Sequence, residues 1–150
     1  MKERVIITDL TRMRRPRVCV AGYLPDCSCV RPVFRRRWPV ENWLRCQGKV
    51  IIRPFAVVEF DFTDTDPQIT PPHTEDRIVN PVYRLAVGTL TTEEQLSLLR
   101  RTAIRGVEDI FGAPVYRTSG GSAYVQMGEG VRSLGTIEPQ EIRRISYTCR

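Results

Sequence analysis

The segment at residues 50–62, VIIRPFAVVEFDF, constrains the fold of this chain more than any other. Its second half alternates between a wholly apolar set of side chains and a set that turns polar: Val58, Phe60 and Phe62 against Val57, Glu59 and Asp61. A period of two places successive side chains on opposite faces of a sheet, so we predict a strand with one buried face. Pro54 predicts a sheet edge or a bulge, because proline cannot donate to a neighbouring strand.

Other β signals precede this segment. Short β-branched runs lie at residues 4–8 (RVIIT), 17–24 (RVCVAGYL) and 29–33 (CVRPV). Pro25 and Asp26 separate the second run from the third and favour the centre of a tight turn, so we predict a β-hairpin there. For residues 39–44, PVENWL, we expect a helical turn or an irregular loop.

One amphipathic helix is predicted at residues 91–112, TTEEQLSLLRRTAIRGVEDIFG. Thr91 and Glu94 have the spacing of a capping box, which satisfies free backbone amides at a helix start. The apolar side chains expected on one helix face are Leu96, Leu99, Ala103, Ile104 and Val107. Gly112 and Pro114 then end the helix.

The rest of the chain is predicted to form loops and strands. Residues 63–80 lack periodicity and are predicted to be one long loop. Strand signals separated by glycines return at residues 115–128, 131–139 and 141–149. TSGGS at residues 118–122 favours a hairpin turn over a phosphate-binding loop, because it lacks the lysine and precedes a strand. With strands on both sides of one helix and no βαβ alternation, we predict a mainly β fold of small barrels with one main α-helix.

The N-terminal sequence and the cysteines indicate the expected cellular compartment. No apolar run approaches the roughly 18 residues that cross a bilayer, and MKERVIITDL is not a secretory signal, so we expect a cytoplasmic protein without membrane contact. The cysteines are odd in number, which favours reduced thiols: Cys19, Cys27, Cys29, Cys46 and Cys149. Cys27 and Cys29 are too closely spaced for a typical zinc-binding pair, so we expect strand-filling cysteines, no metal and no cofactor.

Charge is distributed unevenly along the chain. Residues 1–53 carry a net charge of +9, residues 54–80 a net charge of −5 and residues 81–150 a net charge of +2. Of the 23 basic residues 21 are arginine, whose planar fork matches phosphate and stacks on bases. Codon usage can account for the excess of arginine but not for its clustering, so the first third of the chain is the expected site of contact with polyanions.

Arginines alternate with aromatic side chains in residues 30–43, VRPVFRRRWPVENW. Single-stranded nucleic acid is bound by arginines on phosphates and by aromatic rings under bases. The predicted binding residues, including a second basic loop near residue 14, are Arg12, Arg14, Arg15, Arg31, Phe34, Arg35, Arg36, Arg37, Trp38 and Arg53. An equal alternative places the aromatic side chains, Trp43 included, in the core and leaves the arginines merely solvated.

The chain's one histidine lies in an acidic loop with the sequence PPHTED: Pro71, Pro72, His73, Thr74, Glu75 and Asp76. With Asp61, Asp64 and Asp66 this loop could form a divalent-metal pocket for phosphodiester hydrolysis. Metal motifs, however, repeat their ligands at regular spacing. We therefore favour a structural loop in which the prolines hold an extended segment, His73 docks on the barrel, and Thr74 with an acidic neighbour caps backbone amides.

Several of these segments occur together in a known family. They are TDLTRM (residues 8–13), RVCVAGY (17–23), CVRPV (29–33), IRPFAVVEFDF (52–62), PPHTED (71–76) and SLGTIEP (133–139). In this order they resemble the dual OB-fold-containing domain family of prokaryotes. The resemblance implies two OB-type barrels and a nucleic-acid-binding role in microbial conflict systems. It implies a first OB-like unit with the PPHTED loop at residues 1–80, and a helix with a partial second OB-like unit at residues 81–150, packed as one compact body.

This chain departs from that family in its length, because it stops at Arg150 where relatives continue with further strands. The second barrel is then either incomplete or completed by another chain, and its open sheet edge predicts a homo-oligomer or a protein partner. We expect a nucleic-acid-binding module for single-stranded or structured RNA or DNA, in a sensing or defence context and without catalysis. The alternatives are a metal-dependent nuclease or nucleotide hydrolase at the acidic loop, and a protein–protein interaction module.

Overall fold

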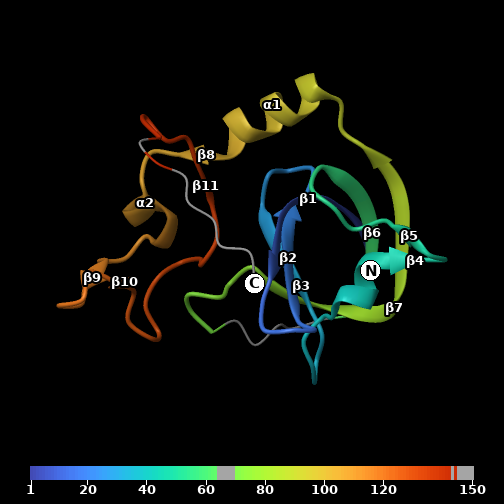
Figure 1. Ribbon diagram of the computed structural model, residues 1–150, viewed down its shortest axis with the longest axis horizontal. Coiled ribbons are helices and arrows are strands. Elements are labelled where there is room, and N and C mark those ends of the chain that lie inside the picture. The colour runs from blue at the N-terminus through green and yellow to red at the C-terminus, as the bar shows by residue number, and fades with distance from the viewer. Residues whose placement is uncertain (64–69, 143, 145–150) are drawn as a thin grey trace.

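A closed five-stranded barrel is the main body of the protein. The computed structural model describes residues 1–63, 70–142 and 144. The strands of the barrel are β1 (Lys2–Arg12), β2 (Val18–Tyr23), β3 (Cys29–Val33), β6 (Ala56–Phe62) and β7 (Asp76–Thr89). Figure 1 shows the barrel with the C-terminal elements beside it. The prediction of a mainly β fold with one main helix is confirmed.

The barrel closes in the order β1-β2-β3-β7-β6. Its neighbouring strands are antiparallel except for β3 and β7, which run parallel from Arg31 opposite Asp76 to Val33 opposite Ile78. Gly22 lies where β2 crosses closest to β1, and a Cβ atom there would come within 2.1 Å of the Ile6 carbonyl oxygen. The arrangement is consistent with a small OB-like barrel.

The interior of the barrel confirms the alternation in β6. Val58, Phe60 and Phe62 are buried, and the side chains between them are half-buried. Trp43 joins this core, with its ring stacked on Phe60 at a centroid distance of 5.4 Å. The β2–β3 hairpin is also confirmed, with its turn closed by a hydrogen bond from the Leu24 N–H to the Ser28 carbonyl. Pro54 lies in the turn before β6 and not within a paired strand, so the edge or bulge predicted there is wrong.

Between β3 and β6 the chain forms a short helical turn and a small hairpin. The 3-10 helix η1 spans Glu41–Leu44, as predicted for that segment. Strands β4 (Arg45–Cys46) and β5 (Lys49–Val50) pair with each other and lie outside the barrel sheet. Within this connection, the residues immediately after β3 form the most basic stretch of the chain.

Strand β7 is the largest departure from the predicted secondary structure. Residues 63–80 were predicted to be loop, but β7 begins at Asp76 and runs for 14 residues. It crosses the domain boundary predicted at residue 80, so the barrel extends to Thr89. The strand shows no alternation because its second half is exposed on both faces, and Asn80 with Pro81 interrupts its sequence as a turn would.

The predicted helix is shorter than expected. Helix α1 spans Thr92–Thr102 with Thr91 as its N-cap, and its capping box with Glu94 is confirmed. Three side chains of the predicted apolar face, Leu96, Leu99 and Ala103, line one hollow together with β11 residues. Leu96 is nevertheless 48% exposed, and the buried leucine of the helix is Leu98, which was not predicted. After α1 the chain forms strand β8 (Ala103–Ile104) and a short helix α2 (Val107–Phe111), which ends at left-handed Gly112. One long helix to residue 112 is therefore wrong; Gly112 ends a separate turn of helix.

The described part of the C-terminal third contains small two-stranded sheets. Strands β9 (Tyr116–Arg117) and β10 (Ala123–Tyr124) form the hairpin predicted around TSGGS. Strand β11 (Thr136–Ile137) pairs parallel with β8. Within residues 90–142 these elements form no second closed barrel. Most of the strand predicted at residues 141–149 lies outside the described residues. Among the described residues no helix is long and apolar enough to cross a membrane.

Candidate nucleic-acid interface

The arginine loop, residues 34–38, connects β3 to the segment before η1. Arg35, Arg36 and Arg37 are exposed and form no ion pair with any described residue. The guanidinium of Arg37 lies 5.9 Å from the centre of the Phe34 ring, close enough for a cation–π contact. Because no carboxylate in the described part of the chain pairs with these cations, their charge is open to an anion from solution.

The second basic loop, which joins β1 to β2, packs next to the arginine loop through backbone hydrogen bonds. Val18 donates its N–H to the Pro39 carbonyl at 2.9 Å, and Glu41 donates its N–H to the Pro16 carbonyl at 2.9 Å. Arg17 and Val40 form an isolated antiparallel bridge between the same segments. The structure therefore brings the two arginine-rich segments together, although residues 18–33 separate them in the sequence.

The aromatic side chains of this region fall into two groups. Trp43 is 5% exposed and makes an edge-to-face contact with Phe34 at a centroid distance of 5.1 Å. Trp43 is thus a core residue, and Phe34 is half-buried against it. Trp38 is 45% exposed. The core interpretation therefore holds for Trp43, while Trp38 presents a ring surface to solvent.

Hollows flank the arginine loop on more than one side. The largest, of about 380 Å³, is lined by Phe34, the three arginines, Thr63 and residues 78–81 of β7. A second, of about 340 Å³, lies along residues 33–39 with Asp76 at its margin. A third, of about 240 Å³, lies between Trp38, Trp43 and Arg84. The loop therefore forms the rim of concave surfaces of a size that can hold parts of a small ligand.

The other predicted binding residues occupy different positions. Arg14 and Arg15 are exposed in the second basic loop, and Arg12 lies 3.9 Å from Glu41 in an exposed ion pair. Arg53, before β6, donates a hydrogen bond to Thr89. Arg31 points elsewhere: its side chain is 12% exposed and its guanidinium pairs with Asp76. We therefore assign Arg31 to the network around the PPHTED loop and not to the exposed basic surface.

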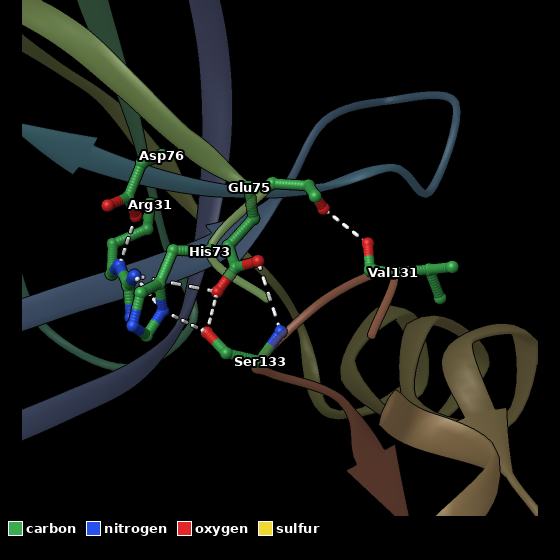
Figure 2. Close-up of polar contacts among 7 residues, drawn as sticks. Arg31, His73, Glu75, Asp76, Val131 and Ser133 are labelled. Atoms are coloured by element: carbon green, nitrogen blue, oxygen red, sulfur yellow. Dashed lines mark hydrogen bonds and ion pairs between the residues drawn. The ribbon is translucent and has the colours of Figure 1, made fainter. Parts of the chain in front are cut away.

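The PPHTED loop connects the barrel to the C-terminal segment, as Figure 2 shows. Glu75 is buried, and its carboxylate accepts hydrogen bonds from the hydroxyl and from the backbone N–H of Ser133, the latter at 3.2 Å. Thr74 donates its hydroxyl to the Val131 carbonyl. Residues 71–75 form turns and not the extended segment that we predicted. The prediction that Thr74 and an acidic neighbour cap nearby backbone amides is wrong, because Thr74 donates to a carbonyl and the amide that Glu75 binds belongs to the distant Ser133.

His73 lies between Arg31 and Ser133. Its Nδ1 atom is 2.9 Å from Arg31 Nη2 and 2.9 Å from the Ser133 hydroxyl oxygen. Arginine can only donate, so Nδ1 accepts from Arg31 in the neutral imidazole while Ser133 donates its hydroxyl proton to Glu75. No hydrogen bond joins the His73 and Glu75 side chains in the described residues, so the three groups do not form the serine–histidine–carboxylate relay of a hydrolase. They tie two parts of the fold together.

The next question is whether the described residues could bind a metal ion or supply a reactive thiol. No group of three or more His, Cys, Asp and Glu side chains within them is placed to hold a metal ion, and Asp64 and Asp66 lie outside them. The four described cysteines are free thiols. Burial, and then the negative charges of Glu75 and Asp9, raise the pKa of the Cys29 thiol to about 12. A thiol with that pKa is protonated at neutral pH and is a poor nucleophile.

Sequence reasoning missed the residues that complete both regions. Asn80 and Pro81, on the floor of the largest hollow, were assigned to loop or left unassigned. Ser133 was noted within a predicted strand and within the SLGTIEP block, but no contact with the PPHTED loop was predicted for it.

No family model matches the chain. No curated protein and no solved structure matches it either.

Proposed function

We propose that this chain is a nucleic-acid-binding module that holds single-stranded or structured RNA or DNA and performs no catalysis. The observation that carries the proposal is the arginine loop, in which three exposed arginines, without an ion pair to any described residue, adjoin the exposed ring of Trp38 beside concave surfaces. Arginines on phosphates and a ring under a base are the contacts by which single strands are held.

The placement of this loop on the barrel supports the proposal further. In OB-type barrels the loop between the first and second strands borders the surface that binds oligonucleotides. In this chain that loop is the second basic loop, and hydrogen bonds fix it beside the arginine loop. The sensing or defence context is part of the proposal, and it is implied by the family resemblance alone.

The test is fluorescence anisotropy of labelled single-stranded RNA and DNA over a salt series, with and without magnesium. The binding variant changes Arg35, Arg36 and Arg37 to glutamine. A matched control changes Arg101, Arg105 and Arg117, which are also exposed but lie in the C-terminal half. We expect the logarithm of affinity to fall with the logarithm of salt concentration by about 0.7 per phosphate contact. The binding variant should lose part of that slope, and the control should keep it.

Absence of binding at low salt, or an equal loss in both variants, would refute the proposal. Probes cut only in the presence of magnesium would instead support a hydrolase at the acidic loop.

A second function, protein–protein interaction, is favoured by the edge of β7. After Ile78 the strand pairs with β6 on one side and with no other strand of the described chain on the other side. Val82 is 82% exposed and Leu85 is 53% exposed along this stretch. Unpaired, apolar strand edges pair readily with another strand.

Light scattering behind a sizing column would test this second function for self-association. Because mass action favours an oligomer as the protein concentration rises, the measured mass should increase over about a hundredfold range of concentration. A constant monomer mass over that range would argue against self-association.

A further inference from the structure

The largest hollow beside the arginine loop has the features of a base-binding pocket. Its walls are mainly apolar and come from the Phe34 ring, Ile78, Val79 and Pro81, and the arginines stand at its rim. A pocket with an apolar interior, a few polar groups and a charged rim matches the three parts of a nucleotide: the face of a base, its polar edge and its phosphate.

The pocket is held by fixed groups. The Phe34 ring packs edge-to-face on buried Trp43. The Pro81 carbonyl accepts hydrogen bonds from the Trp43 indole at 3.0 Å and from Arg84 at 3.4 Å. Phe34 and Pro81, on two sides of the hollow, are both anchored to Trp43. The hollow is therefore formed before a ligand arrives, which lowers the entropy cost of binding.

Asn80 supplies the polar edge. Its side-chain oxygen accepts one hydrogen bond, from the Val82 N–H at 3.2 Å, and its side-chain nitrogen donates one, to Asp61 at 3.5 Å. A primary amide can donate twice and accept twice, so one donor and one acceptor position remain beyond these two bonds. Asparagine contacts adenine with one donor and one acceptor, through N7 and the N6 amino group, which is the number of positions that these two bonds leave to Asn80.

We propose that this hollow, bounded by Phe34, Thr63, Asn80 and Pro81, binds one unpaired nucleobase of a single strand and prefers adenine. The proposal rests on the proposed function and deepens it. The base lies against the Phe34 wall, the Asn80 amide bonds its edge, and its phosphates meet the arginines at the rim. A base paired in a duplex cannot enter, because it must first leave its stack.

The test uses labelled single strands of about 12 nucleotides, within the range of site sizes for OB-type folds. One strand is abasic at every position, and four others carry a single adenine, cytosine, guanine or thymine at the centre. All have the same phosphates, so anisotropy titrations compare the base alone. We expect the wild-type protein to bind the adenine strand about 5- to 150-fold more tightly than the abasic strand.

Three variants locate the effect. Thr63→Trp fills the mouth of the hollow from an exposed position and should remove the difference between adenine and abasic strands while keeping the abasic affinity. Asn80→Ala should reduce the preference for adenine over the other bases. Tyr124→Ala is the matched control, because it removes an exposed ring on β10 that lies outside this hollow, and it should keep the difference. Thermal melts of each variant establish that it folds.

The outcomes separate the two proposals. Equal binding of adenine and abasic strands by the wild-type protein would overturn the pocket and leave the nucleic-acid-binding function intact. The pocket is also overturned if Trp38→Ala removes the difference and Thr63→Trp keeps it, since the base then stacks on the exposed indole. Failure of every strand to bind at low salt would overturn the proposed function itself.

Discussion

The indole N–H of Trp43 donates to the Pro81 carbonyl at 3.0 Å and so links the segment after the arginine loop to strand β7. The same indole stacks on Phe60 inside the barrel. Trp43 therefore anchors the end of the arginine loop to the barrel core. Trp38, five residues earlier in the sequence, is exposed to solvent.

The two tryptophans should respond oppositely to truncation. Trp43→Ala should cost about 3–5 kcal/mol of unfolding free energy, because it empties a packed site. Trp38→Ala should change stability by no more than about 0.5 kcal/mol but weaken binding of single strands by about 1–3 kcal/mol. Urea unfolding and anisotropy measure the two effects. A stability loss of similar size in both variants would contradict this assignment.

The contact of Glu75 with Ser133 should stabilise the packing of the C-terminal segment on the barrel. Glu75→Ala leaves the partly buried Arg31 and the Ser133 amide with fewer partners, so we expect a loss of about 1–3 kcal/mol in urea unfolding. In a double-mutant cycle, Ser133→Ala should cost little more once Glu75 is gone. Additive losses would show that the two side chains act independently.

The second basic loop should contribute charge without contributing base recognition. Changing Arg14 and Arg15 to glutamine should lower the slope of log affinity against log salt by up to about 1.4, or 0.7 for each phosphate contact. The order of preference among bases should stay the same, since phosphate contacts carry no sequence information. An unchanged slope would place this loop outside the bound strand's path.

Acid should weaken the N-terminal cap of helix α1. The Thr91 backbone N–H, and then its hydroxyl, hold the pKa of Glu94 below its ordinary value. A carboxyl with a depressed pKa in the folded state contributes stability above its unfolded pKa, and that stability is lost as the pH falls through the folded pKa. Thr91→Ala should raise the Glu94 pKa part of the way, because the backbone N–H remains. Carbon-detected NMR titration of the carboxyl measures this, and an unmoved midpoint would contradict it.

Cys29 should resist alkylation in the folded protein. Burial, followed by the charges of Glu75 and Asp9, raises its pKa to about 12, so the reactive thiolate is scarce at pH 8. Mass spectrometry after iodoacetamide treatment should find Cys29 labelled slowly in the native protein and rapidly in urea. Equal labelling in both states would contradict the raised pKa of this thiol.

The same shift has a consequence for stability at alkaline pH. The folded state keeps the Cys29 proton up to about pH 12, whereas a cysteine with the ordinary pKa of 9.0 loses it earlier. Because the folded state then binds more protons than the unfolded state, stability should fall as the pH rises between these values. Cys29→Ala should remove that part of the decline, and urea midpoints over the range would measure it.

The barrel was predictable in the segments where one face is buried and the other is solvated. Alternation in β6 and the turn at Pro25 and Asp26 are local signals, and both were confirmed. Strand β7 carries no such signal, since its exposed half needs no apolar face and it pairs with strands distant in the sequence. Helix α1 ends at the buried Thr102, before the end that we predicted. The chain then forms β8, which pairs with the distant strand β11, and helix propensity does not report such a tertiary contact.

The candidate site was predictable in its charges but not in its shape. Arginines next to aromatic residues are visible in the sequence, whereas burial separates Trp43 from Trp38 and an ion pair withdraws Arg31. The pocket floor at Asn80 and Pro81 depends on where β7 passes under the loop. That passage follows from barrel closure, which no local pattern in the sequence expresses.

The parallel pairing of β3 with β7 also sets the order in which the molecule can be assembled during synthesis. The β2–β3 hairpin closes locally, whereas Arg31 and Asp76 meet across 45 positions of the chain. Long-range pairing of this kind forms late, because it bears the entropy of a large loop. A growing chain thus carries its arginines before it carries the strand that closes the barrel beneath them. If the chain binds nucleic acid as proposed, a nascent or partly folded chain would hold phosphates by charge alone, and it would select a base only once the barrel is complete.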